Sequence, residues 1–471
     1  MPVVNWTNND IIKNQLRNRG LLSKSNIAFA FDEIDDTFAT LPHTFWESVA
    51  IFDNQTQQWT LNGSKNGILN QDFYEKYIIF CRNKNDTKHS IAAFLVDRDQ
   101  LQFENDGTDN YGNHYHKIKF ENLVLSRDEH ELYTIPTSDS TQVSLLALNA
   151  KAHGQLMTAA TILGMMKQIL VNMSKMNEDF DTLWNERLCR ANELIFTLES
   201  MIYQTSSHFD TFDCNCTDLF LQSMICKTIA SESAQELLNI SRIQFDSYRL
   251  PKLISTEMEN VLNVLNSFLD STTSNRMLLS AYAMQSIGSW QYDHIAKTRL
   301  TSIYFQHFLK MSIFPKYRKQ TLNRFESSMD GFLILDKLNP ELKPMCKHFR
   351  EVLEIQKEMG LHILSIYGKD CIKNQIDMNR FASITMSAFK IVSVLSRVSQ
   401  SLKQRKDAMS TKLELQMGRS ICQQEAINVA DLKDLIVGVE DVSEEKRSKK
   451  LHKLNIKFEG YFPKPTFDRI I

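Results

Sequence analysis

Glycine and proline are scarce in this chain, which has 14 and 9 of them among 471 residues. Both residues interrupt regular structure, so their scarcity favours a chain rich in helix. No charge of one sign dominates either, because 54 Lys and Arg stand against 56 Asp and Glu and leave a formal net charge of −2. No net field therefore attracts nucleic acid or an acidic surface, and we expect no nucleic-acid partner.

Long apolar runs and a cysteine framework are also missing. No run reaches the roughly 18 apolar residues of a membrane-spanning helix, and the N-terminus carries no hydrophobic signal-peptide segment and only a faintly basic start. Eight cysteines are scattered along the chain: Cys81, Cys189, Cys214, Cys216, Cys226, Cys346, Cys371 and Cys422. Most lie in apolar, helical contexts, which predicts reduced thiols in a cytosolic or matrix compartment.

Common catalytic and metal-binding motifs do not occur. The sequence has no Gly-x-Gly-x-x-Gly, P-loop or Gly-x-Ser-x-Gly motif and no defensible nucleophile–base pair of Cys and His. The densest group of metal-ligand types is His208, Asp210, Asp213, Cys214 and Cys216. Because Cys-x-Cys is not a zinc spacing and no second pair follows, we predict a loop and no metal. His114 and His116 share one face of a strand, which we expect to be solvated.

Residues 24–140 have the pattern of a β-domain. Strands are predicted at 28–31, 48–52, 77–81, 91–96 and 117–120, where apolar residues recur with a period of two. Turns rich in Asn, Asp and Gly separate them, which favours antiparallel pairing. The segment Trp59–Lys65 predicts a strand that runs into a β-turn with Asn62 and Gly63 at its centre.

Beyond residue 140 the period becomes helical. Helices are predicted at 143–176, 184–202, 217–245 and 274–290, and they suggest an antiparallel four-helix bundle within 141–299. A further pair at 341–367 and 378–403 predicts a C-terminal helical domain at 341–471. The chain is thus expected to be an α+β protein, in which a β-domain precedes two helical domains.

Two segments have the composition of contact surfaces. Residues 300–324, in the predicted amphipathic linker 300–340, combine apolar residues with a following basic cluster. Such a segment suits either contact with an anionic membrane surface or burial at an interface. The basic run from Lys446 to Lys457 is expected to be a solvated helix end.

Four strings follow one another along the chain: Leu61–Lys65, Phe120–Leu125, Leu198–Met201, and Met378–Ala382 through Val394–Leu402. In this order they resemble the middle β-domain of the acyl-CoA dehydrogenase family, the strand that closes that domain, the second bundle helix, and the C-terminal domain of the family's very-long-chain branch. That branch includes complex I assembly factors. The family's N-terminal helical domain, one wall of the acyl pocket, would be represented only by a remnant at 1–23. Either a truncated gene model or a true loss of the domain is expected.

The same resemblance implies a catalytic base, and here the sequence departs from the family. Family members abstract the substrate's α-proton with a carboxylate while a flavin accepts the β-hydride. Alignment of the helix around Asn275 places Thr272 where that carboxylate is expected. Threonine cannot act as the base, so no catalytic residue is assigned. Asp270, two residues upstream, is the alternative candidate.

The flavin contacts implied by the resemblance are altered as well. They fall at Asp32, Gly67 and Leu69. A carboxylate at residue 32 opposes a flavin that becomes anionic on reduction. The pyrophosphate loop corresponds to the acidic segment Ser174–Asp179, the adenine turn to Asn239–Ile243 without glycine, and an expected arginine to Ala152. We therefore predict no cofactor.

The resemblance and these departures together imply a catalytically inactive homologue. It is expected to be a mitochondrial homodimer on the matrix side of the inner membrane, where it would contact the membrane peripherally. Its expected role is an interaction scaffold, with complex I assembly proteins as partners. The alternative is an FAD-dependent dehydrogenase of long-chain or very-long-chain acyl-CoA in fatty acid β-oxidation, with a rearranged site.

Overall fold

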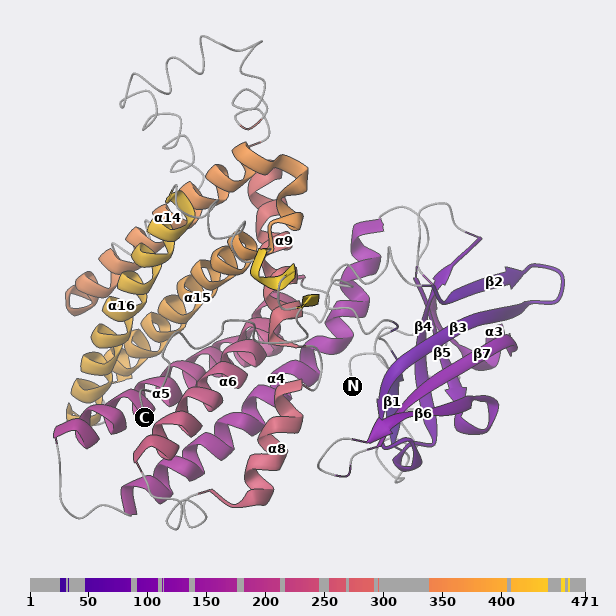
Figure 1. Ribbon diagram of the computed structural model, residues 1–471, viewed down its shortest axis with the longest axis horizontal. Coiled ribbons are helices and arrows are strands. Elements are labelled where there is room, and N and C mark those ends of the chain that lie inside the picture. Colours follow the sequence, from indigo (N-terminus) through magenta and orange to yellow (C-terminus); the bar gives the residue numbers. More distant parts are fainter. Residues whose placement is uncertain are drawn as a thin grey trace, which may run out of the picture. The chain divides into compact units, whose positions relative to one another are not determined.

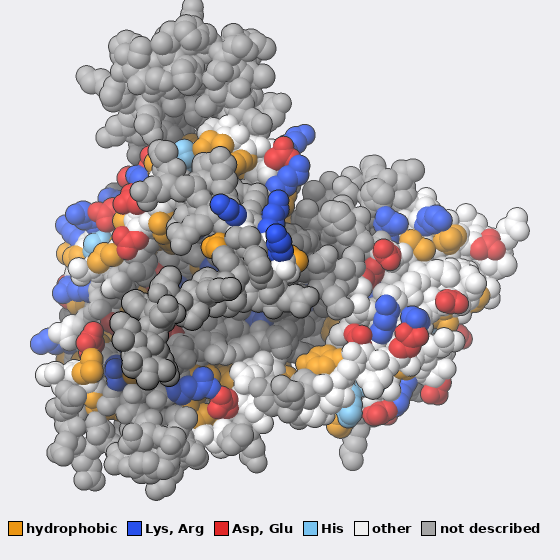
Figure 2. All heavy atoms as spheres, viewed as in Figure 1, with side chains coloured by type: hydrophobic (Ala, Val, Ile, Leu, Met, Phe, Trp, Pro, Cys, Tyr) orange, Lys and Arg blue, Asp and Glu red, His pale blue; other side chains and the backbone are white. Residues whose placement is uncertain are grey.

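The computed structural model describes residues 26–30, 33, 47–85, 91–108, 112, 114–134, 140–175, 182–211, 217–244, 254–267, 271–291, 295, 339–404, 408–438, 450–453 and 456–457. The chain forms two compact units, Met1–Tyr282 with Ser396–Gln400, and Ala283–Leu395 with Ser401–Ile471. Figure 1 shows their elements. On the face drawn in Figure 2, basic and acidic side chains are interspersed over the described elements. The predicted remnant at 1–23 and nearly all of the predicted linker lie outside the described residues.

A single mixed sheet forms the β-domain. Its strands are β1 (Ile27–Ala30), β2 (Val49–Asp53), β3 (Gln58–Leu69), β4 (Lys76–Asn83), β5 (Ile91–Asp97), β6 (Gln102–Thr108), β7 (His114–Ser126) and β8 (Glu131–Thr134). Their order is β6-β7-β3-β2-β4-β5-β8, and β1 pairs with β4. The five predicted strands are confirmed, whereas β6 and β8 were not predicted. A short helix, α3 (Arg127–His130), joins β7 to β8.

The expected antiparallel pairing is found for most neighbouring strands, but the sheet is mixed, because β1 and β2 both run parallel to β4. The reason lies in the connection between β2 and β4. Strand β3 returns antiparallel to β2, and the one-turn helix η1 (Gln71–Phe73) reverses the chain again. Strand β4 therefore has the same direction as β2 and pairs with it through Arg82 and Asn83.

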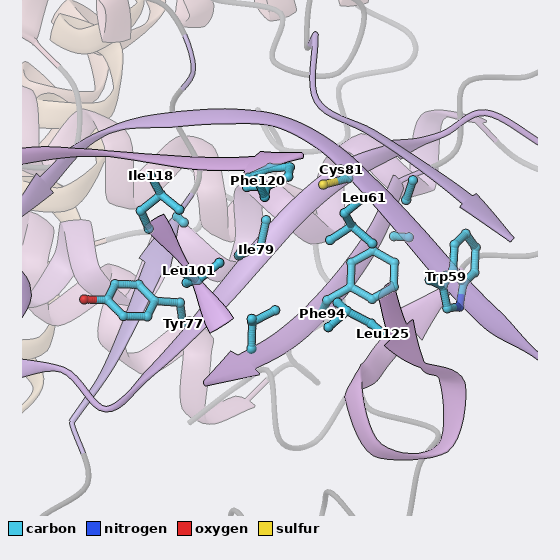
Figure 3. Packing of buried hydrophobic residues seen from close by; sticks show 14 of the residues in the cluster. Trp59, Leu61, Tyr77, Ile79, Cys81, Phe94, Leu101, Ile118, Phe120 and Leu125 are labelled. Carbon is cyan, nitrogen blue, oxygen red and sulfur yellow. The ribbon is translucent and has the colours of Figure 1, made fainter. Parts of the chain in front are cut away.

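The core of the β-domain lies on one face of this sheet, where large apolar side chains interdigitate (Figure 3). Trp59 packs edge-on against Phe94, with ring centroids 5.2 Å apart, and its indole nitrogen donates a hydrogen bond to Glu131 Oε2 at 2.7 Å. Ile118 and Phe120 of β7 enter the same cluster. Burial of this apolar surface is the main force that holds the sheet together.

The predicted β-turn at Asn62–Gly63 is not formed, since both residues lie within β3. The positive φ of Gly63, 145°, accompanies a register shift against β7 rather than a reversal of the chain. A Cβ at Gly63 would lie 2.6 Å from Ser48 Cα, so glycine also permits close approach of the backbones. Asn62 Oδ1 accepts a hydrogen bond from the Asn122 amide at 2.7 Å across this bulge. Pairing of β3 with strands on both sides overrides the local turn signal.

The helical bundle contains α4 (Ser140–Lys175), α5 (Thr182–Thr211), α6 (Thr217–Gln244), α8 (Thr256–Ser267) and α9 (Thr272–Trp290). The four predicted helices are confirmed, and α8 was not predicted. Helix α6 packs against both α4 and α5. Arg190 of α5 forks onto Glu236 of α6 with N–O distances of 2.7 and 3.1 Å, which fixes the register of that pair.

The C-terminal helices are α14 (Lys343–Tyr367), α15 (Gln375–Gln404) and α16 (Ala408–Val437). The predicted pair corresponds to α14 and α15, whereas α16 was not predicted. Helix α16 packs on α14 and carries a buried carboxylate, Glu425. Ser387 Oγ and Lys390 Nζ of α15 donate to its two oxygens at 2.6 and 2.9 Å, so this buried charge is both paired and hydrogen-bonded.

Arg397, in the part of α15 that belongs to the first unit, reaches a carboxylate of the bundle. Its Nη1 donates to Glu199 Oε2 of α5 at 2.6 Å, and its guanidinium lies 4.2 Å from the centroid of the Phe196 ring. Lys167 of α4 also pairs with Glu199. One carboxylate thus joins three helices, and two cations balance it.

Two helices are long and apolar enough to cross a membrane, judged by length and composition alone. Neither contains an uninterrupted apolar run of about 18 residues, which is why the sequence did not predict a membrane-spanning helix. They are Lys151–Lys175 in α4 and Gln375–Gln404, each with a mean hydropathy of 1.3. Of these two apolar windows, 39% and 61% is buried inside the structure. Core helices of a bundle pass the same test, because helices that pack on several sides are apolar over much of their circumference.

Candidate functional site

A buried ion pair organises the part of the β-domain where the flavin contacts were expected. Lys65 Nζ lies 2.6 Å from Glu33 Oε1, and these side chains are 0% and 3% exposed. The second oxygen of Glu33 accepts from the backbone amides of Glu47 and Ser48, and the Glu33 carbonyl accepts from Asn66 Nδ2 at 2.8 Å. Through these contacts Glu33 connects the segment that follows β1 to the residues just before β2 and to the bulged part of β3.

Glu33 was not identified from the sequence, but a signal for it was present. With a period of two, Lys65 falls on the same face as Trp59 and Leu61, which are both in the core. A lysine on a core face requires a buried counter-charge. That requirement predicts an acidic partner without revealing which one.

Cys81 lies close to this ion pair but is not a nucleophile. Its side chain is fully buried, and burial raises the pKa of the thiol to about 12, more than the nearby Lys65 ammonium lowers it. The thiol is therefore protonated at neutral pH, and the reactive species is the thiolate. The same cause raises the pKa of Cys226 and of Cys422 to about 12.

Two of the three expected flavin positions are described, and both lie at the end of β3. Gly67 is exposed at a second bulge with φ 71°, and no atom lies within 4 Å of where its Cβ would be. Leu69 is partly buried and pairs with Tyr115 of β7. Neither side chain offers a hydrogen bond. The third position, Asp32, lies outside the described residues.

Thr272, at the expected position of the base, is the first residue of α9. Ser271 caps this helix, because its Oγ accepts the Ser274 amide at 3.1 Å. Four residues after Thr272, Arg276 donates to both oxygens of Glu232 of α6 at 2.7 and 2.8 Å. This segment thus presents hydroxyl groups and an internally neutralised carboxylate. The alternative base, Asp270, lies outside the described residues.

The remaining cofactor positions do not suit a dinucleotide such as FAD. Residues 239–243, expected to receive adenine, form the last turns of α6, where the backbone amides are used within the helix. Ser241 Oγ donates to the Leu237 carbonyl, and Arg242 pairs with Glu259 of α8. Ala152 is fully buried in α4. Of the expected pyrophosphate loop, only Ser174 and Lys175 are described, at the end of α4.

Of the histidines considered as metal ligands, His208, His114 and His116 are described. His208 Nδ1 is hydrogen-bonded to Gln222 Oε1 at 2.8 Å, and the neighbouring candidates from Asp213 to Cys216 lie outside the described residues. Within the described ranges, no three His, Cys, Asp or Glu side chains form a group that could hold a metal. The expectation for His114 and His116 is half wrong: His114 is exposed, but His116 is 9% exposed because it shares the core-facing side of β7 with Ile118.

Comparison with known proteins gives one sequence match and many structural ones. Residues 340–457 match the family model described as ACAD9/ACADV, C-terminal domain. No curated protein matches the chain in sequence. Acyl-CoA dehydrogenase complexed with FAD from Bacillus anthracis has a TM-score of 0.62 at 14% identity, over 93% of this chain and 72% of that chain. This likeness shows the fold alone.

Two further solved structures are less similar. Butyryl-CoA dehydrogenase from Megasphaera elsdenii has a TM-score of 0.47 at 15% identity, over 59% of this chain and 72% of that chain. Glutaryl-CoA dehydrogenase from Mycobacterium smegmatis has a TM-score of 0.47 at 13% identity, over 59% of this chain and 70% of that chain.

Proposed function

Since this chain has the acyl-CoA dehydrogenase fold and its residues 340–457 belong to the ACAD9/ACADV C-terminal domain family, we propose that it is a catalytically inactive homologue of those enzymes. Its role is that of an interaction scaffold in the assembly of respiratory complex I. The single observation that carries the proposal is the hydroxyl side chain of Thr272 at the start of α9, where a carboxylate base is expected.

Proton abstraction next to a thioester needs a group that accepts a proton near neutral pH. The Thr272 hydroxyl is not such a group. Both oxygens of Glu232 accept hydrogen bonds from Arg276, so this carboxylate is not available to accept a proton from a substrate. A general base that must first break a bidentate ion pair is poorly suited to catalysis. The local chemistry therefore favours a structural role for the α9 start.

The FAD positions support the same proposal. The helical end of α6 withholds the backbone amides that a phosphate or an adenine would use, and Arg242 in that segment is paired with Glu259. When bound, FAD would supply a hydride acceptor. At its expected positions Ser174 Oγ already donates to the Val171 carbonyl and Arg242 is paired with Glu259, and Lys175 at the end of α4 is the described cation of the expected pyrophosphate loop. We therefore derive no redox step for this chain.

The scaffold is proposed to be a homodimer that binds its partners on the matrix side of the inner mitochondrial membrane. One face of α4 supports the dimer: Met157 and Val171 are 71% and 44% exposed, and Ala160, Thr161 and Gly164 between them are exposed and uncharged. Exposed apolar side chains at helical spacing are a common feature of subunit interfaces. Peripheral membrane contact is assigned to residues 300–324, which lie outside the described residues.

A flavin assay tests the loss of catalysis. The full chain, purified after expression with excess riboflavin, should be colourless, and acid extraction should release no stoichiometric FAD. Palmitoyl-CoA should cause no reduction of an artificial electron acceptor. A yellow preparation that is bleached by palmitoyl-CoA would instead establish the alternative function, an FAD-dependent dehydrogenase of long-chain acyl-CoA. That alternative is favoured by one observation, the intact Lys65–Glu33 pair beside the expected flavin wall.

Affinity purification from mitochondria tests the scaffold role. The tagged full chain should recover inner-membrane complex I assembly proteins at a fixed stoichiometry. Helix α16 offers a variant, because Leu413 and Ile427 are 50% and 47% exposed and their replacement by Glu spares the core. The matched control is Val124→Glu in β7, where the side chain is 52% exposed. Recovery of no assembly protein by the unaltered chain would refute the role.

A further inference from the structure

Strand β3 contains two Asn-Gly pairs, Asn62–Gly63 and Asn66–Gly67, and they lie in different surroundings. An asparagine followed by glycine can react with its own backbone, because the glycine nitrogen attacks the side-chain Cγ and no Cβ shields that nitrogen. The reaction requires a backbone that can bend toward the side chain. The two pairs therefore allow a comparison within a single strand.

The backbone around Asn62 is fixed from both sides. Asn62 has a pairing partner in β2, and Gly63 has one in β7. A Cβ at Gly63 would lie 2.6 Å from Ser48 Cα, so β2 is in close contact with this point of the strand. The side chain of Asn62 is also engaged, since its Oδ1 accepts from the Asn122 amide at 2.7 Å. Reaction at Asn62 would therefore have to separate β3 from a neighbouring strand.

The backbone around Asn66 lacks this pairing. Asn66 and Gly67 form the second bulge of β3 and have no partner residue in the described part of the sheet, where β2 pairs only as far as Asn62. Gly67 is exposed with φ 71°, and no atom lies within 4 Å of where its Cβ would be. The Asn66 amide donates from Nδ2 to the Glu33 carbonyl at 2.8 Å, and its Oδ1 has no partner within the described residues. Backbone freedom and access of water thus both favour reaction here.

We propose that Asn66 is a site of spontaneous deamidation. The Gly67 backbone nitrogen loses its proton and bonds to Asn66 Cγ, the bond from Cγ to Nδ2 breaks, and ammonia departs from the resulting succinimide ring. Water then opens the ring. Attack of water on the side-chain carbonyl gives aspartate, and attack on the main-chain carbonyl gives isoaspartate. The net reaction converts asparagine and water into an acid and ammonia, without oxidation or reduction, so water is the sole co-reactant.

Deamidation of Asn66 would act on the segment that holds Glu33. The product can no longer donate to the Glu33 carbonyl and places a carboxylate oxygen beside it instead. Attachment of this segment to β3 should therefore weaken. Isoaspartate also lengthens the main chain by a methylene group, which a bulge accommodates more readily than a paired stretch of strand. The modified protein should stay folded with a lower melting temperature.

The reaction needs only the chain and water, so this proposal does not depend on the scaffold role. The full chain is incubated in warm, mildly alkaline buffer and digested with trypsin at successive times. Cleavage after Lys65 places the two Asn-Gly pairs in different peptides. Mass spectrometry measures conversion of amide to acid at each site, and an isoaspartate-specific methyltransferase with S-adenosylmethionine labels the isoaspartate. In the folded chain, Asn66 should react about tenfold faster than Asn62.

The unfolded chain and one variant are the controls. In urea the difference between the two sites should disappear, because both asparagines precede glycine and strand pairing no longer holds either. Asn66→Gln should abolish the signal at residue 66, since the longer side chain forms the ring far more slowly. Equal rates at the two sites of the folded chain would overturn the proposal. A faster reaction at Asn62, or a difference that persists in urea, would overturn it as well.

A second pair of variants tests the effect on Glu33. Asn66→Asp carries the charge of the product and should lower the melting temperature. The matched control is Asn70→Asp, because Asn70 Oδ1 accepts from the His114 amide at 3.0 Å and an aspartate keeps that acceptor. Its melting temperature should stay close to that of the unaltered chain. Equal melting temperatures for the two variants would refute the effect on Glu33.

Discussion

Lys65 Nζ and Glu33 Oε1 are 2.6 Å apart in the interior of the β-domain, and neither side chain reaches solvent. The pair connects a residue that follows β1 to the middle of β3. Its desolvation is compensated by hydrogen bonds from backbone amides to the second carboxylate oxygen. The pair therefore acts as an internal brace, that is, a buried ion pair that stabilises the sheet.

Removal of one partner should be costly. Lys65→Met leaves the Glu33 carboxylate buried without its cation, and we expect a loss of about 3–5 kcal/mol in the free energy of unfolding. The double variant Lys65→Met with Glu33→Gln should recover a large part of that loss, because the amide still accepts from the backbone. Urea denaturation measures both. Lys119→Met, which breaks an exposed pair with Glu104, is the control and should change little. Equal effects of the two lysine variants would contradict the brace.

Substitution of Gly63 should lower the stability of the protein more than substitution of Gly107, a glycine with a similar φ. Gly63 and Gly107 have φ values of 145° and 139°, but of the two only Gly63 has other atoms, Ser48 Oγ and Cα, where an added Cβ would lie. Gly107→Ala should therefore cost about 1–3 kcal/mol from backbone strain alone. Gly63→Ala should cost more, since β2 must also move. Thermal unfolding of the two variants compares them, and a smaller loss for Gly63→Ala would refute the close approach.

The strand that continues through Gly63 shows where prediction from the sequence fails. The Asn62–Gly63 pair has the composition of a hairpin turn, yet β3 continues through it because β2 and β7 pair with it from both sides. Such pairing is non-local and leaves no trace in a short string. Conversely, strands with a clear apolar alternation, such as Ile91–Asp97, were predicted within a residue or two.

The elements that were missed have different physical reasons. Strand β6, with the sequence Gln102–Thr108, is exposed along nearly all its length and so lacks an apolar face. Helix α16 exposes Met409, Leu413 and Ile427 and buries Glu425, which blurs its helical period. The positions of Thr272 and Ala152 could be located by resemblance, but their surroundings could not, because ion pairs such as Arg276–Glu232 join residues far apart in the chain.

Glu199 should make stability depend on pH. Burial alone raises its pKa, but hydrogen bonds and charges from Lys167 and Arg397 outweigh burial and hold the pKa below its ordinary value of 4.5. A carboxylate with a lowered folded-state pKa stabilises the fold above its unfolded pKa, and this contribution is lost as the pH falls through the folded pKa. The stability difference between the unaltered chain and Glu199→Gln should therefore be full at neutral pH and shrink below 4.5.

Urea denaturation at several pH values measures this difference. Glu104→Gln is the control, because that side chain is 53% exposed and its pair with Lys119 is screened by solvent. The difference in the free energy of unfolding between Glu104→Gln and the unaltered chain should be small and should not change with pH. A constant offset for Glu199→Gln as well would show that the Arg397 and Lys167 contacts do not select the charged form.

Gly164 tests the proposed dimer. No atom lies within 4 Å of where its Cβ would be, and the residue is exposed, so Gly164→Leu should leave the isolated subunit folded. If the Met157–Val171 face of α4 joins two copies, the larger side chain should shift the chain to monomers. Light scattering coupled to size-exclusion chromatography gives the mass. Lys175→Leu, at the exposed end of α4, is the control. A dimer that tolerates Gly164→Leu would place the interface elsewhere.

The uneven exposure of the cysteines has a practical consequence. Of the described cysteines, Cys189 on α5 is exposed, whereas Cys81, Cys226, Cys346, Cys371 and Cys422 are buried. A maleimide dye should therefore mark α5 rapidly while those five sulfurs stay silent until their surroundings open. Timed alkylation followed by peptide mapping would then report, without any engineered label, whether the sheet and the helices come apart together or in sequence.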